Sequence, residues 1–389
     1  MKRAVIAIVF ILFTHTAFAG LDEDLIKAAE AGDKKKVESL LAKGANVNTK
    51  DEYGWTALHW VALKGRTEIV KLLLSKGAKV NTKNDSGDTA LHMATKSKHK
   101  KIELVKLLID KGGKVNAKNK YDNTALHSAA LSKSAEMVKL LIGKGADVHT
   151  KNILGNTALH HAASGGVKET VKLLTSKGAD VNAKNKDGKT ALHLAVGNVN
   201  ALTIAPLISK GAIVNAKDNI GNSALHDAVY YGRIEIAKLL ISKGSNVNMK
   251  NKHGNTALHL AAFTAFPEGK EIAKLNIKQL ISNGADVNLQ NNKGLTALHY
   301  AAEWGKPERV QLLISEKADV NVKNKSGWTV LHTAVDNKQW EIVKYLIAKK
   351  ADINVKIKSG KHKGKTPLDM AKNKQIKDYL KKHGAKSGK

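Results

Sequence analysis

Histidine is the residue type in this chain that most invites a chemical interpretation. Nine of the sixteen histidines recur about every 33 residues, a pattern that suggests metal ligands. Zinc needs ligand nitrogens within about 4 Å of one another, whereas copies one repeat apart lie roughly 10 Å apart if helices pack normally. A metal site is therefore not expected. The nine residues are His59, His92, His127, His160, His193, His226, His259, His299 and His332.

A second candidate is a near match to a phosphate-binding loop, Ser359–Thr366, which ends in Gly-Lys-Thr. Its first position is Ser instead of Gly, and such a loop needs a preceding strand and a following helix. The chain has no HExxH, GxSxG or GxGxxG motif. It also has no cysteine, which excludes thiol chemistry. We therefore expect no enzyme, no cofactor and no catalytic residue.

The repeated histidines belong to a four-residue phrase, Thr-Ala-Leu-His. Successive copies are 33, 35, 33, 33, 33, 33, 40, 33 and 37 residues apart. A fixed period near 33 indicates a stacked repeat array, in which each unit buries its face on its neighbours. The phrase begins at Thr56, Thr89, Thr124, Thr157, Thr190, Thr256 and Thr296, with variants at Ser223, Thr329 and Thr366.

The residues around each phrase predict the elements that carry it. Thr is a good N-cap for a short helix. A later amphipathic run, such as residues 68–77, places its apolar residues on one face of a second helix. The run ends at Gly77, where a C-cap favours positive φ. Each unit is thus a turn, two helices and an extended connector such as Gly178–Asn182.

These phrases resemble those of ankyrin repeat proteins over roughly residues 21–385. The family's usual Thr-Pro-Leu-His keeps its proline only at Pro367, but Ala also suits a first helical turn. The resemblance implies an all-α repeat solenoid of about eleven helix-turn-helix units with protruding β-hairpin-like fingers and capped ends. It also implies a structural role for the repeated histidine, which bonds the adjacent Thr and the finger backbone.

The N-terminus predicts export. Lys2 and Arg3 precede an apolar run, residues 4–13, and Ala17-Phe18-Ala19 forms a cleavage site, so residues 1–19 read as a secretory signal peptide. The run is too short for a spanning helix, which needs about 20 residues. We expect cleavage after Ala19 and a secreted or periplasmic protein; an uncleaved anchor is the alternative.

The mature chain divides into three predicted regions: an N-terminal capping repeat at 20–50, nine repeats at 51–356, and a C-terminal capping repeat with a basic tail at 357–389. Insertions near 97–101 and 263–270 fall between the helices of their units, and four extra residues lengthen the last finger. Such insertions often belong to a binding face, although they can be tolerated drift. Pro206 predicts a kinked or shortened helix at 203–207.

The formal net charge is +31. Such a charge suggests a polyanion binder. However, 61 of the 65 basic residues are lysine, and arginine is what bidentate phosphate recognition prefers. The lysine excess is therefore either functional or a consequence of an AT-rich genome, which favours lysine and asparagine codons.

The resemblance assigns partner binding to the fingers and first helices that line a concave face. Aromatic residues are only 4% of the chain, yet they gather at these positions and alternate with lysines. The predicted partner-binding residues are Tyr53, Trp55, Tyr121, Tyr230, Tyr231, Tyr300, Trp304, Trp328, Lys120, Lys186, Lys252, Lys293 and Lys325. Alternatively, Trp55 and Trp328 pack finger to finger, and Tyr300 packs on its own helix.

The sequence therefore predicts an exported, monomeric, non-enzymatic scaffold that binds a protein partner with an acidic surface. The alternative is a charge-driven binder of an anionic polymer, either nucleic acid or acidic polysaccharide. Salt distinguishes them, since polyanion binding weakens steeply as salt rises.

Overall fold

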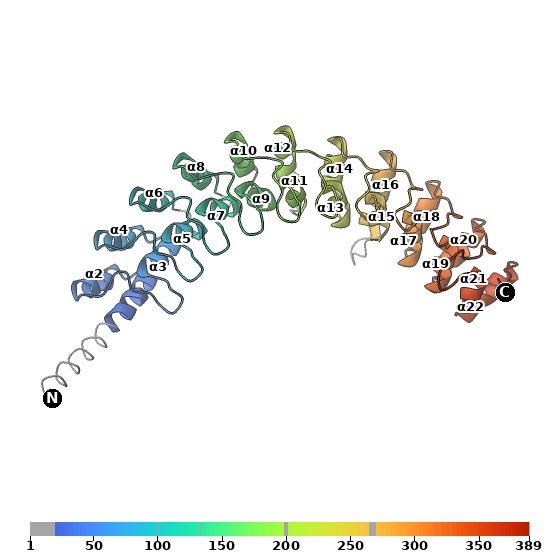
Figure 1. Cartoon of the computed structure of the whole chain (residues 1–389), viewed down its shortest axis with the longest axis horizontal. Helices are drawn as coiled ribbons and strands as arrows, with labels where there is room; N and C mark the ends of the chain where they lie inside the picture. The colour runs from blue at the N-terminus through green and yellow to red at the C-terminus, as the bar shows by residue number, and fades with distance from the viewer. Residues whose placement is uncertain (1–19, 100, 133, 198–200, 264–269, 389) are drawn as a thin grey trace, which may run out of the picture. The chain divides into compact units, whose positions relative to one another are not determined.

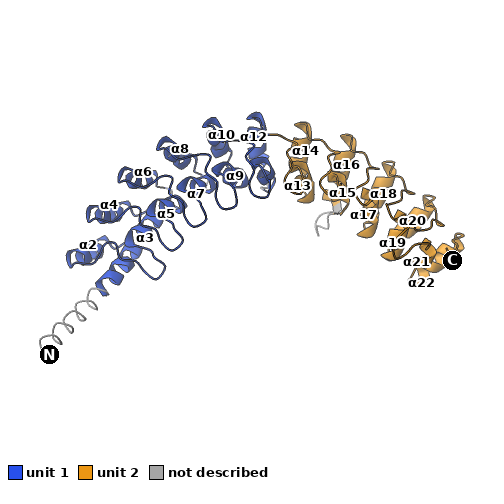
Figure 2. Cartoon of the chain, viewed as in Figure 1, with its two compact units in different colours: residues 1–212 blue, residues 213–389 orange. Residues whose placement is uncertain are grey.

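The computed structural model describes residues 20–99, 101–132, 134–197, 201–263 and 270–388. The predicted signal peptide and most of the insertion near 263–270 lie outside these residues. The chain divides into two compact units, residues 1–212 and 213–389 (Figure 2).

Unit 1 is a stack of helix pairs. Its shorter helices form an inner layer, its longer helices form an outer layer, and each helix packs on the equivalent helix of the next pair (Figure 1). The helices are residues 20–31, α2 (Lys34–Ala42), α3 (Ala57–Leu63), α4 (Thr67–Ser75), α5 (Ala90–Lys96), α6 (Ile102–Asp110), α7 (Ala125–Leu131), α8 (Ala135–Gly143), α9 (Ala158–Ser164), α10 (Lys168–Ser176), α11 (Ala191–Val196) and α12 (Ile204–Ser209).

Unit 2 has the same two layers. Its outer helix α16 is 13 residues long where α14 has nine, so part of the predicted insertion extends the start of that helix. The helices are α13 (Ala224–Tyr230), α14 (Ile234–Ser242), α15 (Ala257–Phe263), α16 (Lys270–Ser282), α17 (Ala297–Glu303), α18 (Pro307–Ser315), α19 (Val330–Asp336), α20 (Trp340–Ala348), α21 (Pro367–Met370) and α22 (Lys374–Lys382). These pairs confirm the predicted all-α repeat solenoid.

The core of each unit comes from the repeated phrase and the amphipathic run. Leu58 and Ala62 of α3 are buried, as are Val70 and Leu73 of α4. The small alanines allow inner helices to approach closely, and the aliphatic side chains fill the space between the two layers. Truncating one such leucine to alanine costs about 2–5 kcal/mol.

Pro206 shortens its outer helix, as predicted. A 3₁₀ turn at Ala201–Thr203 precedes α12, which has six residues where α10 has nine. Because α12 starts at Ile204, Pro206 falls in the first turn, where a backbone N–H has no intrahelical acceptor to lose. The proline is therefore accommodated without breaking a helical hydrogen bond.

The fingers are turns, not pairs of long strands. In one finger the Asn84 side chain accepts hydrogen bonds from the backbone N–H of Ser86 and Asp88 at 3.0 and 2.9 Å. Neighbouring fingers are joined by backbone bonds, such as Lys120 N–H to the Ser86 carbonyl at 2.9 Å. Within the described residues, the β-structure is one isolated bridge between Lys323 and Thr329.

Candidate partner-binding surface

The repeated histidines tie each inner helix to two neighbouring segments. In the first full repeat, Nδ1 of His59 accepts from the Thr56 N–H at 3.1 Å and lies 2.9 Å from the Thr56 hydroxyl. Nε2 lies 3.0 Å from the carbonyl oxygen of Asp88 in the next finger. An accepting Nδ1 leaves the proton on Nε2, which donates to that carbonyl. The same pair of contacts recurs at His92, His127, His160, His226, His259 and His299.

Burial keeps these imidazoles neutral. Burial lowers the pKa of five of them to about 4, which the hydrogen bonds to the finger backbone only partly offset. Protonating such a ring would place a positive charge in a buried site away from water. It would also put a proton on Nδ1, which could then no longer accept from the Thr N–H. The five residues are His127, His160, His259, His299 and His332. In the seven hydrogen-bonded histidines, both ring nitrogens therefore make hydrogen bonds within the protein.

Asparagine is a second repeated connection. In the connectors, the Asn48 side chain accepts from the Lys79 N–H at 2.8 Å and donates to the Gly77 carbonyl at 3.2 Å. The last copy, Asn354, accepts in the same way from Lys386 at 2.7 Å. The repeated asparagines therefore have a structural use, whatever the codon composition behind them.

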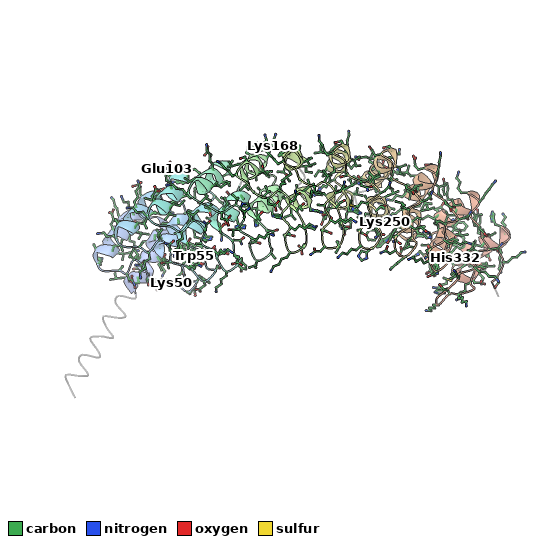
Figure 3. The ribbon with its side chains drawn as sticks, turned by 45° about the horizontal axis from the view of Figure 1, so that its top comes forward. Lys50, Trp55, Glu103, Lys168, Lys250 and His332 are labelled. Carbon is green, nitrogen blue, oxygen red and sulfur yellow. The ribbon has the colours of Figure 1, made fainter. Side chains whose placement is uncertain are left out.

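Some lysines are also structural. Lys50 donates to the Lys83 carbonyl at 2.8 Å, and Lys83 donates to the Lys118 carbonyl at 2.7 Å. In unit 2, Lys217 and Lys250 make the same finger-to-finger contact at 2.9 and 2.7 Å. Figure 3 shows Lys50 with Trp55 on the finger side of unit 1, opposite Glu103 and Lys168 of the outer helices.

Two arginines contact helix ends. Arg66 donates to the Glu30 carbonyl at 3.3 Å, and the buried Arg309 donates to the Ala262 carbonyl at 2.9 Å. Each acceptor lies at the C-terminal end of the preceding inner helix, where backbone carbonyls lack helical partners. These guanidinium groups are engaged with backbone instead of being displayed to a phosphate ligand.

In unit 1, three of the predicted aromatic side chains lie on fingers. Tyr53 and Tyr121 are exposed at finger tips. Trp55 is half-buried, and its ring centroid lies 4.6 Å from that of Trp60 on α3. Trp60 also donates to Asp51 at 3.1 Å. Trp55 therefore packs on the inner helix of its own repeat.

In unit 2, the predicted aromatics gather at the C-terminal ends of inner helices. Tyr230 and Tyr231 follow one another at the end of α13, with ring centroids 5.3 Å apart, and both are exposed. Trp304, which is 43% exposed, caps α17. Its ring lies 4.9 Å from Phe263 of α15, which also contacts Tyr300 at 6.1 Å. We name Tyr230, Tyr231, Phe263, Tyr300 and Trp304 the aromatic tract.

Tyr300 is anchored as well as half-buried. Its hydroxyl accepts from Asn291 at 3.1 Å and lies 3.4 Å from the Asn255 side-chain oxygen, so it joins its helix to two fingers. Burial raises the pKa of this phenol, partly offset by the Asn255 contact. Tyr300 therefore supports the aromatic tract, while Tyr231 and Trp304 present it to solvent.

Trp328 follows the finger-packing alternative. It is half-buried, and its ring lies 6.0 Å from His332 of its own repeat and 5.6 Å from His362 of the next finger. The five predicted lysines, in contrast, are exposed at finger tips: Lys120, Lys186, Lys252, Lys293 and Lys325. The partner-binding role of all thirteen residues stays a prediction.

Residue-type reasoning missed part of this surface. Phe263 holds in its repeat the position of Tyr230 in the preceding one, and aligning the repeats would have identified it. In unit 1, Leu131 is 53% exposed and borders a hollow of about 410 Å³, together with Ser128, His161 and Lys96. The ring of His161 lies 5.6 Å from that of His127. This hollow was not predicted.

The structure also bears on the two chemical candidates raised by the sequence. The hydroxyl of Thr366 lies 3.0 Å from an Asp369 oxygen and 2.8 Å from the Lys386 carbonyl oxygen, so its single proton is shared within its own repeat. Among the described residues, no three His, Asp or Glu side chains gather as a metal site. In the same residues, no helix combines the length and apolar character needed to cross a bilayer.

Three known proteins match short stretches of this chain. Protein VAPYRIN-LIKE from Medicago truncatula is 41% identical over 59 residues, and the mouse 2-5A-dependent ribonuclease is 48% identical over 50 residues. Ankyrin repeat domain-containing protein SAT10 from Stachybotrys chartarum is 35% identical over 63 residues. These matches cover 14%, 13% and 16% of this chain but only 13%, 7% and 3% of the relatives.

The family comparison covers far more. The profile described as "Ankyrin repeats (3 copies)" matches residues 19–84, 81–152, 126–218 and 269–357. The profile described as "Ankyrin repeats (many copies)" matches residues 207–261. Ankyrin repeats are generally protein–protein interaction scaffolds, and domains built from them are typically non-enzymatic. Together with the repeated helix pairs, these matches show that the chain belongs to the ankyrin repeat family.

Proposed function

We propose that this protein is an exported, non-enzymatic scaffold that binds a protein partner through the fingers and inner helices of its concave face. The observation that carries the proposal is the aromatic tract of unit 2. Tyr230, Tyr231 and Trp304 are 43%, 46% and 43% exposed at the ends of two inner helices. Tyr and Trp are enriched at the energetic centres of protein interfaces.

The surroundings of the tract support a protein ligand. Phe263 packs against Trp304 and is itself in contact with Tyr300, so the Trp304 ring loses little conformational freedom when a partner covers it. Exposed lysines at the finger tips, such as Lys252 and Lys293, form a basic rim. A partner with an apolar centre and an acidic edge fits this arrangement.

Export is supported by the pattern of residues 2–19 alone. Expressing the full chain in its own cells and measuring the intact mass of the recovered protein tests this step. An intact mass equal to that of residues 20–389 supports export with cleavage. An intact mass that includes residues 1–19 contradicts it.

Affinity capture tests the protein-binding proposal. With residues 20–389 as bait, a discrete protein that survives a high-salt wash supports the scaffold. Replacing Tyr231 and Trp304 by alanine is expected to abolish that capture. Leu275→Ala is the matched control, because Leu275 is an exposed apolar side chain on the outer helix α16. Equal loss in both variants would mean that the tract is not the interface.

The net charge of +31 supports a second candidate, a charge-driven binder of nucleic acid or acidic polysaccharide. Recovery of mixed acidic polymers that a raised-salt wash removes would favour it. Such binding would survive Tyr231→Ala and Trp304→Ala. A monomeric state, checked by light scattering on the mature chain, is part of the scaffold proposal.

A further inference from the structure

The C-terminal repeat holds an unusual concentration of positive charge. Residues 357–388 contain two carboxylates, Asp369 and Asp378, and ten lysines. The four extra residues of the last finger lie within this segment. The lysines are Lys358, Lys361, Lys363, Lys365, Lys372, Lys374, Lys377, Lys381, Lys382 and Lys386.

Part of this charge surrounds a hollow of about 700 Å³. The lengthened finger contributes Lys363 and Lys365, and α22 contributes Lys377 and Lys381. Residues 387–388 line one side, where the Gly388 N–H donates to Asp369 at 2.8 Å. Three separate segments therefore line one hollow, and four of the lining residues are lysines.

The carboxylate in this hollow is already satisfied. Asp369 accepts hydrogen bonds from the Thr366 N–H and hydroxyl at 2.9 and 3.0 Å, from the Ser387 hydroxyl at 2.7 Å and from the Gly388 N–H at 2.8 Å. Burial alone would raise its pKa, but these bonds outweigh burial and hold the pKa far below its usual value. Asp369 anchors the tail and, within the described residues, forms no ion pair with a lysine.

The four lysines have no carboxylate partner among the described residues. The lysine of this repeat that does form an ion pair is Lys372, at 3.6 Å from Asp336. Four like charges around one hollow repel one another, and an anion placed between them would relieve that repulsion.

We infer that the hollow binds a compact anion that carries several phosphate groups. Lysine ammonium groups act as point charges toward phosphate, and the volume lies within the range of about 300–1,000 Å³ that small ligands occupy. The described residues that line the hollow include no aromatic ring, so they offer no platform on which nucleic-acid bases stack. This favours a compact polyphosphate over single-stranded nucleic acid.

The site lies apart from the aromatic tract and goes beyond the protein-binding function. It does not depend on that function, because a protein partner and a phosphate ligand would use different residues. Failure of the capture experiment would leave the hollow untouched, and failure of phosphate binding would leave the scaffold proposal untouched.

Isothermal titration calorimetry of the full chain with inorganic tripolyphosphate at physiological ionic strength tests the inference. We expect one binding site. Lys377→Gln with Lys381→Gln should weaken binding at least about tenfold, since two of four lining charges are lost. The control pair, Lys374→Gln with Lys382→Gln, removes the same charge from the same helix but lies outside the lining and should change affinity less than about threefold.

Circular dichroism on both variants separates lost binding from lost folding, and a Lys363→Gln variant on the finger gives a second readout if α22 unfolds. Absence of binding at millimolar tripolyphosphate would overturn the inference. Equal weakening of binding by the two double variants would also overturn it, because binding would then depend on the overall positive charge and not on the lining residues. The inference would also be overturned if a single-stranded oligonucleotide bound more tightly than tripolyphosphate and its affinity were unchanged by Lys377→Gln with Lys381→Gln.

Discussion

Leu131 in unit 1 and Tyr230 in unit 2 stand at the same position of the repeat, and so do Ser132 and Tyr231. The first pair differs in chemistry while the backbone beneath is the same: both positions end an inner helix whose alanines and leucine are buried. Unit 1 thereby exposes a hollow beside His161, and unit 2 exposes an aromatic tract. The comparison teaches that the buried positions determine the scaffold and leave the inner-helix ends free to specify a ligand.

The units also differ at the helix ends that require positive φ. Unit 1 has glycine at each outer-helix end, such as Gly77 with φ 85°. Unit 2 has lysine at two of these ends, Lys317 with φ 68° and Lys350 with φ 61°. A side chain in this region costs about 1–2 kcal/mol. Unit 2 therefore carries backbone strain that unit 1 lacks at equivalent positions.

The largest expected effect is acid destabilisation of both units. The folded-state pKa of a buried histidine is about 4 at His127 and His160 in unit 1 and at His259, His299 and His332 in unit 2, below the ordinary value of 6.5. The unfolded chain then binds more protons, so stability is full above pH 6.5 and falls as pH drops toward 4. Each such histidine contributes up to about 3 kcal/mol.

Urea unfolding followed by circular dichroism at pH 7.5, 6 and 5 measures this loss. We expect the midpoint to fall at each step. Because histidines with a lowered pKa lie in both units, hydrogen exchange should show both units opening more readily as the pH falls. An unchanged midpoint between pH 7.5 and 5 would contradict the assignment of neutral buried imidazoles.

A buried leucine in each unit tests their independence. Leu126→Ala in α7 and Leu298→Ala in α17 each remove a fully buried side chain, at an expected cost of about 2–5 kcal/mol. Repeats contact mainly their neighbours, so protection from hydrogen exchange should fall in the mutated unit. Equal loss of protection throughout the chain would show a single cooperative array.

The difference between the two units at their inner-helix ends predicts a smaller effect, which concerns partner binding and not stability. Trp304→Ala should weaken capture of a protein partner by about 2 kcal/mol or more, because exposed aromatics at interface centres contribute this much. Leu131→Ala, which removes the exposed apolar side chain at an inner-helix end of unit 1, reports whether the hollow shares in binding. Surface plasmon resonance with the captured partner measures both; a larger loss for Leu131→Ala would move the interface to unit 1.

The smallest predicted effect concerns backbone strain. Lys317→Gly should stabilise unit 2 by up to about 1 kcal/mol, since relief of the positive φ exceeds the added entropy of the unfolded chain. The reciprocal change, Gly284→Lys, should destabilise through the backbone alone, because an added Cβ there meets no atom within 4 Å. The urea unfolding midpoints of both variants measure these changes. A Gly284→Lys variant that is more stable than the parent protein would contradict the assignment of backbone strain.

Much of the fold could be predicted, because short sequence patterns that recur along the chain specify its helices and turns. The spacing of Thr-Ala-Leu-His indicated each inner helix, and Pro206 indicated the shortened outer helix α12. The site was predictable only in part. Aromatic residue type pointed to Tyr231 and Trp304, but it could not separate these exposed rings from Trp328, which packs between His332 and His362.

The sequence by itself determined the repeat, the family and the structural role of the repeated histidine, because each depends on a short phrase that recurs with a fixed period. Only the tertiary structure decided which lysines are engaged, as Lys50 is with the Lys83 carbonyl, and which are free to meet an anion. It also decided that Lys365 and Lys381 border one hollow. The physical reason is that stacking brings together side chains from different segments, and their exposure and pairing depend on neighbours that no local pattern specifies.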